Sequence, residues 1–285
     1  MKKRSFSSWR LLGLSLVLFT ACRTDVPTPT NELASEHLRL GNPSRATPDT
    51  SSYSNYLIQK SQYVLSYNRQ RGIANWVSWH LDATWLGMAN RQNDFRPDAS
   101  LPVRWPRPIS ADYASSGFDR GHLCPSGDRT KNTTDNSSTF LMSNIFPQSP
   151  DSNQGPWAAL EEYCRKLARR GNELYIVAGP SGAGGTGREG KKDYLSSGRV
   201  TVPAFTWKVV VVLANGDNDL KRVNASTRVI AVQMPNRQGI RDEDWGTFRL
   251  SVNELEVATG YDFLSLVKPS VQHLVESRTD QGPVQ

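Results

Sequence analysis

Three apolar runs in the second half of the chain place the strongest constraint on its fold. They read ELYIVAG (173–179), FTWKVVVVL (205–213) and TRVIAVQMP (227–235), and all three contain several β-branched residues. Residues of this kind favour strands. A doubly wound fold would alternate such strands regularly with helices, and this chain has no regular alternation. The sequence therefore predicts an α+β fold.

Earlier segments add further strands. The runs QYVLSYN (62–68) and IANWVSWHLD (73–82) flank the short segment RQRG (69–72). Two β-rich runs around a glycine-containing turn are typical of a hairpin. The segment FLMSNIFPQ (140–148) begins with apolar residues and is a candidate for another strand.

The segment GPWAALEEYCRKLARRG (155–171) has the clearest helical pattern. Pro156 suits the first turn of a helix, and Gly171 is a typical stop signal. The apolar positions that share one face are Trp157, Leu160, Cys164 and Leu167. The segment SVNELEVATG (251–260) predicts a second, shorter helix that ends at Gly260.

The first 22 residues have the pattern of an export signal. A basic start precedes the apolar stretch 11–19, which is too short to span a bilayer. The sequence Thr-Ala-Cys at 20–22 resembles a bacterial lipobox. We expect residues 1–22 to be a signal peptide of the lipoprotein type, with Cys22 lipidated. The exported protein would be a periplasmic or cell-surface lipoprotein, or secreted; an uncleaved apolar N-terminus is the alternative.

Export changes both the charge and the organisation of the chain. Removal of residues 1–22 takes away four cations and no acids, which lowers the formal charge from +7 to +3. That charge permits nucleic-acid binding without requiring it. Residues 23–52 are rich in Pro, Ser and Thr, which predicts a flexible tether. We expect the folded domain to span 53–275 and the C-terminal tail to span 276–285.

A glycine-rich stretch has the spacing of a dinucleotide-binding motif. Gly182, Gly184 and Gly187 spell G-x-G-x-x-G directly after a strand run. A dinucleotide fold needs a helix with an apolar stripe at this point, and the residues that follow, REGKKDYLSSG (188–198), have no such stripe. We therefore expect a flexible loop over 179–193.

The residues DRGH at 119–122 suit the cleavage of a phosphodiester. A neutral His122 can accept the proton of an attacking water near pH 7, and Arg120 can stabilise charge on the phosphoryl oxygens. Gly121 is expected to let the backbone turn. Asn153 and Glu161 offer oxygen atoms to a hydrated Mg²⁺. Taken singly, each of these residues has a purely structural interpretation.

Three segments in this order resemble the DNA/RNA non-specific endonuclease family, the ββα-metal group that includes Serratia nuclease and endonuclease G. The segments are DRGH (119–122), SNIFPQ (143–148) and NQGPWAALE (153–161). Weaker resemblance extends from Leu40 to about residue 265. The resemblance implies a ββα-metal nuclease fold, in which helices flank a central and mostly antiparallel sheet.

The resemblance also implies a role for each matching residue. His122 looks like the general base, Asn153 like the direct Mg²⁺ ligand, and Glu161 like the carboxylate that holds metal-bound water. Asn144 looks like the asparagine that supports the site. Mn²⁺ is an alternative to Mg²⁺.

Basic residues near these segments are candidates for phosphate contacts. Arg120 occupies the motif's arginine position, and the family's upstream arginine matches Arg91, with Arg96 as its rival. Further candidates for contacts with the nucleic-acid backbone are Arg104, Arg107, Arg129 and Lys131. The other histidines, His37, His80 and His273, have no motif around them and are expected to be structural.

Cysteine pairing stays open. If Cys22 carries a lipid, Cys124 and Cys164 remain, and the sequence does not decide between a disulfide and two thiols.

The resemblance implies an exported, Mg²⁺-dependent endonuclease that cleaves DNA and RNA without sequence preference and leaves 5′-phosphate ends. The alternatives are a non-catalytic nucleic-acid-binding module and a phosphodiesterase that acts on another substrate.

Overall fold

The computed structural model describes Met1 and residues 35–285. The signal peptide, the lipidation of Cys22 and the first part of the tether lie outside the described residues. Residues 35–285 belong to one compact unit. In the described part of the chain, no helix has the length and apolar character needed to cross a membrane.

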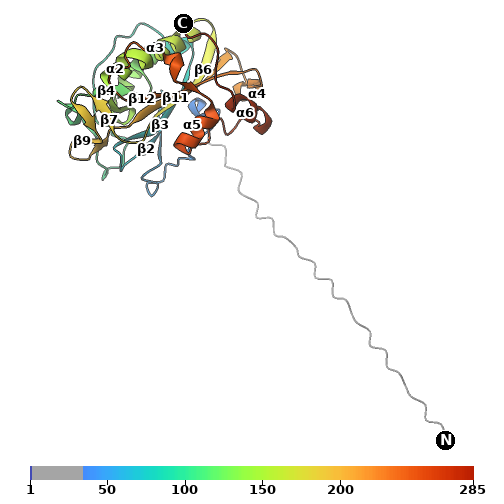
Figure 1. The fold of residues 1–285 in the computed structure, drawn as a ribbon, viewed down its shortest axis with the longest axis horizontal. Helices are drawn as coiled ribbons and strands as arrows, with labels where there is room; N and C mark the ends of the chain where they lie inside the picture. The colour runs from blue at the N-terminus through green and yellow to red at the C-terminus, as the bar shows by residue number, and fades with distance from the viewer. Residues whose placement is uncertain (2–34) are drawn as a thin grey trace. The chain divides into compact units, whose positions relative to one another are not determined.

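A seven-stranded sheet forms the centre of this unit (Figure 1). Every neighbouring pair of its strands is antiparallel. In spatial order the strands are β1 (Tyr56–Gln59), β2 (Val64–Asn68), β3 (Ile73–Leu81), β6 (Asn172–Ser181), β11 (Phe205–Ala214), β12 (Arg228–Pro235) and β13 (Arg249–Leu250). The predicted hairpin and the three predicted apolar strands are confirmed, as is the α+β fold class.

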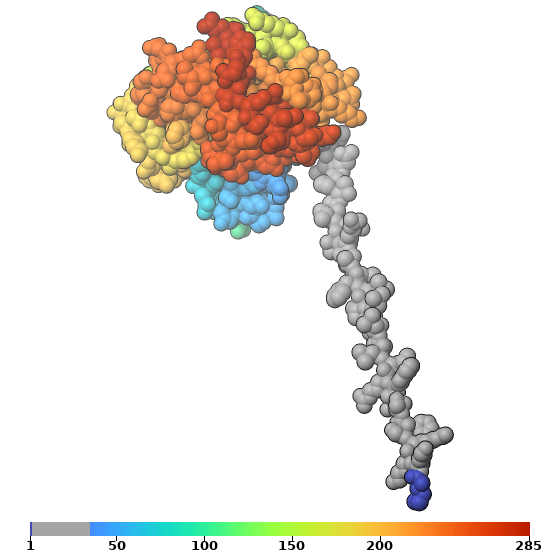
Figure 2. Space-filling view, turned by 45° about the vertical axis from the view of Figure 1, so that its right-hand side comes forward, coloured from blue at the N-terminus to red at the C-terminus, as the bar shows by residue number. Residues whose placement is uncertain are grey.

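Both faces of the sheet are covered. On β11, Val210 packs into the core on one face, whereas Val209 and Val211 pack into the core on the other. The first core includes buried residues of α3 (Ala158–Arg169). The second includes residues of α5 (Val252–Thr259) and α6 (Pro269–Glu276), and Figure 2 shows the C-terminal residues gathered on one side of the domain. The result is a three-layer arrangement.

Short elements complete the fold and lie mostly at its edges. The strands β4 (Asp119–His122) and β5 (Ile145–Gln148) form a separate antiparallel pair. The others are α1 (Thr133–Ser138), α2 (Pro150–Ser152), β7 (Gly185–Gly187), β8 (Gly190–Lys192), β9 (Tyr194–Leu195), β10 (Val200–Thr201) and α4 (Asp219–Arg222).

The two glycine stop signals in the sequence act as expected, whereas Pro156 lies just before α3 and not in its first turn. Gly171 follows α3 with a φ of 87°, and Gly260 ends α5 with a φ of 73°. Only glycine adopts such angles without strain. At the start of α5, Ser251 and Glu254 form a reciprocal capping box, which satisfies two backbone N–H groups that the first turn leaves free.

Both predicted domain boundaries are wrong, because each end of the described chain packs on the sheet. Leu40 and Ala46, in the expected tether, are buried in the second core. At the other end, in the expected tail, the carboxylate of Asp280 accepts hydrogen bonds from Arg228 and Arg249. The composition of these segments is polar, yet their few apolar and charged residues find partners on the folded domain.

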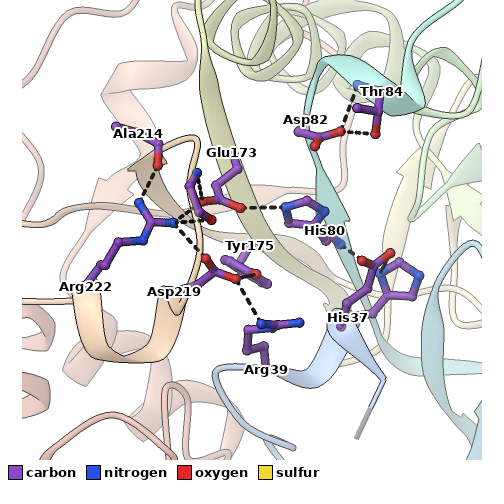
Figure 3. A network of polar contacts seen from close by, with 12 residues as sticks. His37, Arg39, His80, Asp82, Thr84, Glu173, Tyr175, Ala214, Asp219 and Arg222 are labelled. Atoms are coloured by element: carbon purple, nitrogen blue, oxygen red, sulfur yellow. Dashed lines mark hydrogen bonds and ion pairs between the residues drawn. The ribbon is translucent and has the colours of Figure 1, made fainter. Parts of the chain in front are cut away.

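A polar network secures the N-terminal segment (Figure 3). The guanidinium of Arg39 lies 3.3 Å from Asp219 of α4, and Asp219 also pairs with Arg222 at 2.7 Å. Arg222 in turn pairs with Glu173, whose other oxygen lies 3.1 Å from His80 Nε2. His80 therefore has a structural role, as predicted.

The glycine-rich segment 179–193 is not a loop. It contains the antiparallel strands β7 and β8, and the backbone N–H of Arg188 donates to the carbonyl of Gly117 at 2.9 Å. The hairpin therefore lies beside the chain that leads into β4.

Candidate active site

The DRGH segment forms a strand, which corrects the expected turn. It is β4, and its residue His122 pairs with Ile145 of β5. Gly121 has no positive φ; a Cβ built on it would lie 2.3 Å from Gln148 Oε1 and 2.6 Å from Gln148 Cβ. Glycine is therefore needed because the Gln148 side chain approaches the backbone closely.

His122 is almost fully buried, with 8% of its surface exposed. Its ring packs edge-on against Phe140 at 4.9 Å and lies 5.6 Å from Phe95. Burial, and then the nearby cations Arg91 and Arg120, lower the pKa of His122 to about 3. Its Nε2 has no hydrogen-bond partner among the described residues. The imidazole is therefore neutral and free to accept a proton.

Two arginines are fixed beside His122 by the same aromatic rings. The guanidinium of Arg91 lies over Phe140 at 4.8 Å, and that of Arg120 lies over Phe95 at 4.4 Å. Arg91 also donates to Ser126 Oγ at 2.6 Å. Cation–π contacts of this kind hold a guanidinium in place without consuming its charge. The two cations are thus ordered and available to an anion.

A kinked segment, Asn153–Trp157, joins α2 to α3, and Gly155 within it has the non-helical angles φ −109° and ψ −115°. In a regular α-helix, residues eight positions apart lie about 80° from a common face, because each residue turns by about 100°. The kink at Gly155 breaks this regular relation between the two positions, and Asn153 and Glu161 line the same hollow. Gly155 makes the distortion possible, since a Cβ there would lie 2.3 Å from the carbonyl oxygen of Arg241.

Asn153 and Glu161 present oxygen atoms to the same space. The Nδ2 group of Asn153 donates to Asp119 Oδ2 at 2.8 Å, so its amide orientation is set, and Oδ1 accepts no hydrogen bond from the described residues. The Glu161 side chain is 14% exposed. Burial raises the pKa of Glu161, and the cations Lys208 and Arg165 oppose that rise.

One hollow of about 370 Å³ brings the predicted residues together. His122, Asn153 and Glu161 all line it, along with Arg91 and Arg120. A neighbouring hollow of about 800 Å³ shares Arg91, Arg120 and Asn153 with it. His122, the two arginines and the two oxygen donors therefore converge on one open site.

The donor set fits a hard divalent cation. One amide oxygen and one carboxylate suit Mg²⁺, which binds few protein ligands and keeps several waters. Within residues 35–285 there is no group of three or more His, Cys, Asp or Glu residues that could hold a metal. An ion at this site would be held by Asn153 and, through water, by Glu161.

Two arginines that the sequence suggested for substrate binding have other roles. Arg129 is fully buried, and its guanidinium donates to the backbone carbonyls of Gln62 and His80, so it cannot reach a substrate. Arg96 pairs with Asp94 at 2.6 Å and lines a different hollow. Neither Arg104, Arg107 nor Lys131 lines either of the two shared hollows.

Asn144 supports the site from the interior. It is fully buried, and its amide accepts from the N–H of Cys124 and donates to the carbonyls of Cys124 and Thr139. These bonds fix the chain just after His122. Cys124 and Cys164 are both buried as free thiols, so the structure contains no bridge between them.

Sequence reasoning missed two basic residues at the site. Arg165 lines the smaller hollow and pairs with Asp128 at 3.0 Å; it lies four positions after Glu161, which places it on the same helix face. Lys208 lies 3.9 Å from Glu161. Its position as a lysine inside the apolar run FTWKVVVVL could have identified Lys208 from the sequence.

The antiparallel pair β4 and β5, with His122 on β4, and the helix α3, with Glu161, give a strand–strand–helix arrangement. The chain is an enzyme of the ββα-metal nuclease class. The family model for DNA/RNA non-specific endonucleases matches residues 41–270. The chain belongs to the DNA/RNA non-specific endonuclease family.

Individual relatives agree with this assignment. The chain is 51% identical over 261 residues to a nuclease of Nostoc sp., which covers 90% of this chain and 92% of the relative. It is 30% identical to human mitochondrial nuclease EXOG, over 71% of this chain and 55% of that protein. A crystal structure of the EndoG/EndoGI complex aligns with a TM-score of 0.67 and 25% identity, covering 85% of this chain and 95% of that one.

Proposed function

We propose that this protein is an exported, Mg²⁺-dependent endonuclease that hydrolyses DNA and RNA without sequence preference and leaves 5′-phosphate ends. The observation that carries the proposal is the shared hollow in which His122, Asn153 and Glu161 meet. Membership of the endonuclease family supports the reaction class. The basic and apolar start of the chain supports export, with Cys22 as the lipidation site.

In this proposal His122 removes the proton from the attacking water. Its pKa of about 3 makes it neutral but only weakly basic in the free protein. A bound phosphate would neutralise the field of Arg91 and Arg120, which are among the causes of the low pKa. Substrate binding therefore raises the basicity of His122 as the water is placed beside it.

Arg91 and Arg120 bind the phosphoryl oxygens and stabilise the charge that grows on them. Asn153 would hold Mg²⁺ directly, and Glu161 would hold it through water. When bound, Mg²⁺ supplies positive charge to the phosphoryl group and the leaving oxygen. Contacts to phosphate rather than to base edges account for cleavage without sequence preference.

Plasmid DNA and a structured RNA, each incubated with Mg²⁺, with Mn²⁺ and with EDTA, test the proposal. We expect both to be cut with either metal and to stay intact in EDTA, and the products to be ligated without prior phosphorylation. Binding without any cleavage would favour a non-catalytic module. Hydrolysis of only small phosphodiesters would favour the other alternative.

Export has its own test. Expression of the full chain, followed by membrane fractionation and mass spectrometry of the mature N-terminus, should find a lipidated Cys22. A Cys22→Ser variant should leave the membrane fraction. An N-terminus that still begins at Met1 would contradict the export proposal and leave the nuclease proposal untouched.

A further inference from the structure

Lys208 is a buried cation for which packing alone gives no reason. It lies on β11, an interior strand of the sheet, opposite Ala178 of β6 and Val232 of β12. Both neighbours are buried apolar residues, and Lys208 itself is only 1% exposed. An apolar side chain would fill this position at no electrostatic cost, whereas a buried ammonium is costly unless it has partners.

The partners of Lys208 all belong to the scaffold of the active site. Its ammonium lies 4.1 Å from the centre of the Trp157 ring and 5.7 Å from that of Trp79. Trp157 is the last residue of the kinked segment that begins at Asn153. Among the described residues, Glu161 is the one carboxylate within ion-pair distance of Lys208, at 3.9 Å. Lys208 therefore contacts Glu161 itself and also Trp157, four residues after Asn153, from the side of the sheet.

The indole rings keep this ammonium in a fixed position. Trp79 is itself held by a hydrogen bond from its Nε1 to Asp128 Oδ2 at 2.9 Å, and Asp128 pairs with Arg165. Cation–π contacts are strong where the cation is shielded from water. The charge that faces Glu161 is therefore anchored to a rigid strand and not to a mobile surface side chain.

We propose that Lys208 is a positioning residue for the metal site, which holds the Glu161 carboxylate by one oxygen so that the other faces the hollow. This inference rests on the proposed function of Glu161 as the carboxylate that orients metal-bound water. Groups that orient a metal's direct and water-mediated ligands change metal affinity by about 10–100-fold when they are removed.

A purely electrostatic role makes the opposite prediction. If Lys208 acted only as a nearby positive charge, it would repel a divalent cation, and its removal would tighten metal binding. If it positions Glu161, its removal leaves a buried carboxylate without its partner, and metal binding weakens. The sign of the change in affinity therefore distinguishes the two roles.

The experiment measures the Kd for Mn²⁺, used alone as the probe, by titration calorimetry. We expect Lys208→Met to raise this Kd at least tenfold. The control Lys221→Met removes an exposed lysine of α4 and should leave it unchanged. Thermal melting and near-ultraviolet circular dichroism report whether the fold persists. If Lys208→Met does not fold, Lys208→Gln keeps a polar group in the space and should raise the Kd for Mn²⁺ to the same extent.

A double-mutant cycle with Glu161→Gln makes the test specific. Once the carboxylate is gone, Lys208→Met should change the Kd for Mn²⁺ by less than twofold. The inference would be overturned if Lys208→Met alone left the Kd for Mn²⁺ unchanged or lowered it. It would also be overturned if Lys208→Met weakened Mn²⁺ binding equally with Glu161 and with Glu161→Gln. A wild-type protein that binds Mn²⁺ but cuts no nucleic acid would overturn the proposed function instead. The effect of Lys208→Met on the Kd for Mn²⁺ would still test the positioning role.

Discussion

Replacement of Gly121 by alanine should disable the site by displacing the strand that carries His122. The new Cβ would lie 2.3 Å from Gln148 Oε1 and 2.6 Å from Gln148 Cβ, so one of the two strands must move by about 1 Å to reach an ordinary contact. Gln148 has little freedom to yield, because it is fully buried and paired with Asp119 in β5.

The size of the effect follows from this overlap. Overpacking of a core position costs about 1–3 kcal/mol of unfolding free energy, which lowers Tm by between about 2 and 12 °C in a domain of this size. A shift of about 1 Å at a catalytic group lowers the rate by about 100-fold. We therefore expect a folded protein with a modest loss of stability and a large loss of kcat.

The assay compares kcat on plasmid DNA and Tm for three variants. Gly216→Ala is the matched control, because its new Cβ would meet nothing closer than 3.5 Å and its φ is not positive. Gly121→Ala combined with Gln148→Gly should recover activity, since it removes the clash. Wild-type kcat and Tm in Gly121→Ala alone would refute the reasoning.

Four further predictions concern the site residues and the two buried thiols. His122→Ala should lower kcat by about 10²–10⁴-fold with binding retained. In the wild type, the decline of kcat/KM on the acidic side should lie below pH 6.5, since the pKa of His122 in the folded protein is lowered to about 3. His122 also makes the folded state less stable as pH drops from 6.5 towards 3, because its imidazole is protonated in the unfolded state before it is protonated in the folded state. Arg91→Met should lower kcat and leave Tm nearly unchanged, whereas Arg129→Met should lower Tm, because only Arg129 is buried against backbone carbonyls. Dithiothreitol should change neither Tm nor activity, since Cys124 and Cys164 are free thiols. A lower Tm or a lower activity in dithiothreitol would indicate a disulfide between them.

Residue types and local periodicity predicted much of the framework. The β-branched runs became β6, β11 and β12, and the amphipathic segment became α3. These patterns are readable because each depends on neighbours within a few positions. The domain boundaries could not be predicted from local patterns, because the polar segments at both ends are ordered by residues far away in the chain. The pair formed by Asp280 and Arg228 is one example.

The sequence alone determined which chemical groups are available: an imidazole, arginines, an amide and a carboxylate in a recognisable order. Only the tertiary structure decided which of them meet. Arg129 turned inward to satisfy backbone carbonyls. The chain kinks between Asn153 and Glu161, and both line one hollow. The strand β11 placed Lys208 behind Glu161. Convergence of this kind depends on contacts between segments distant in sequence, and local composition carries no information about such distances.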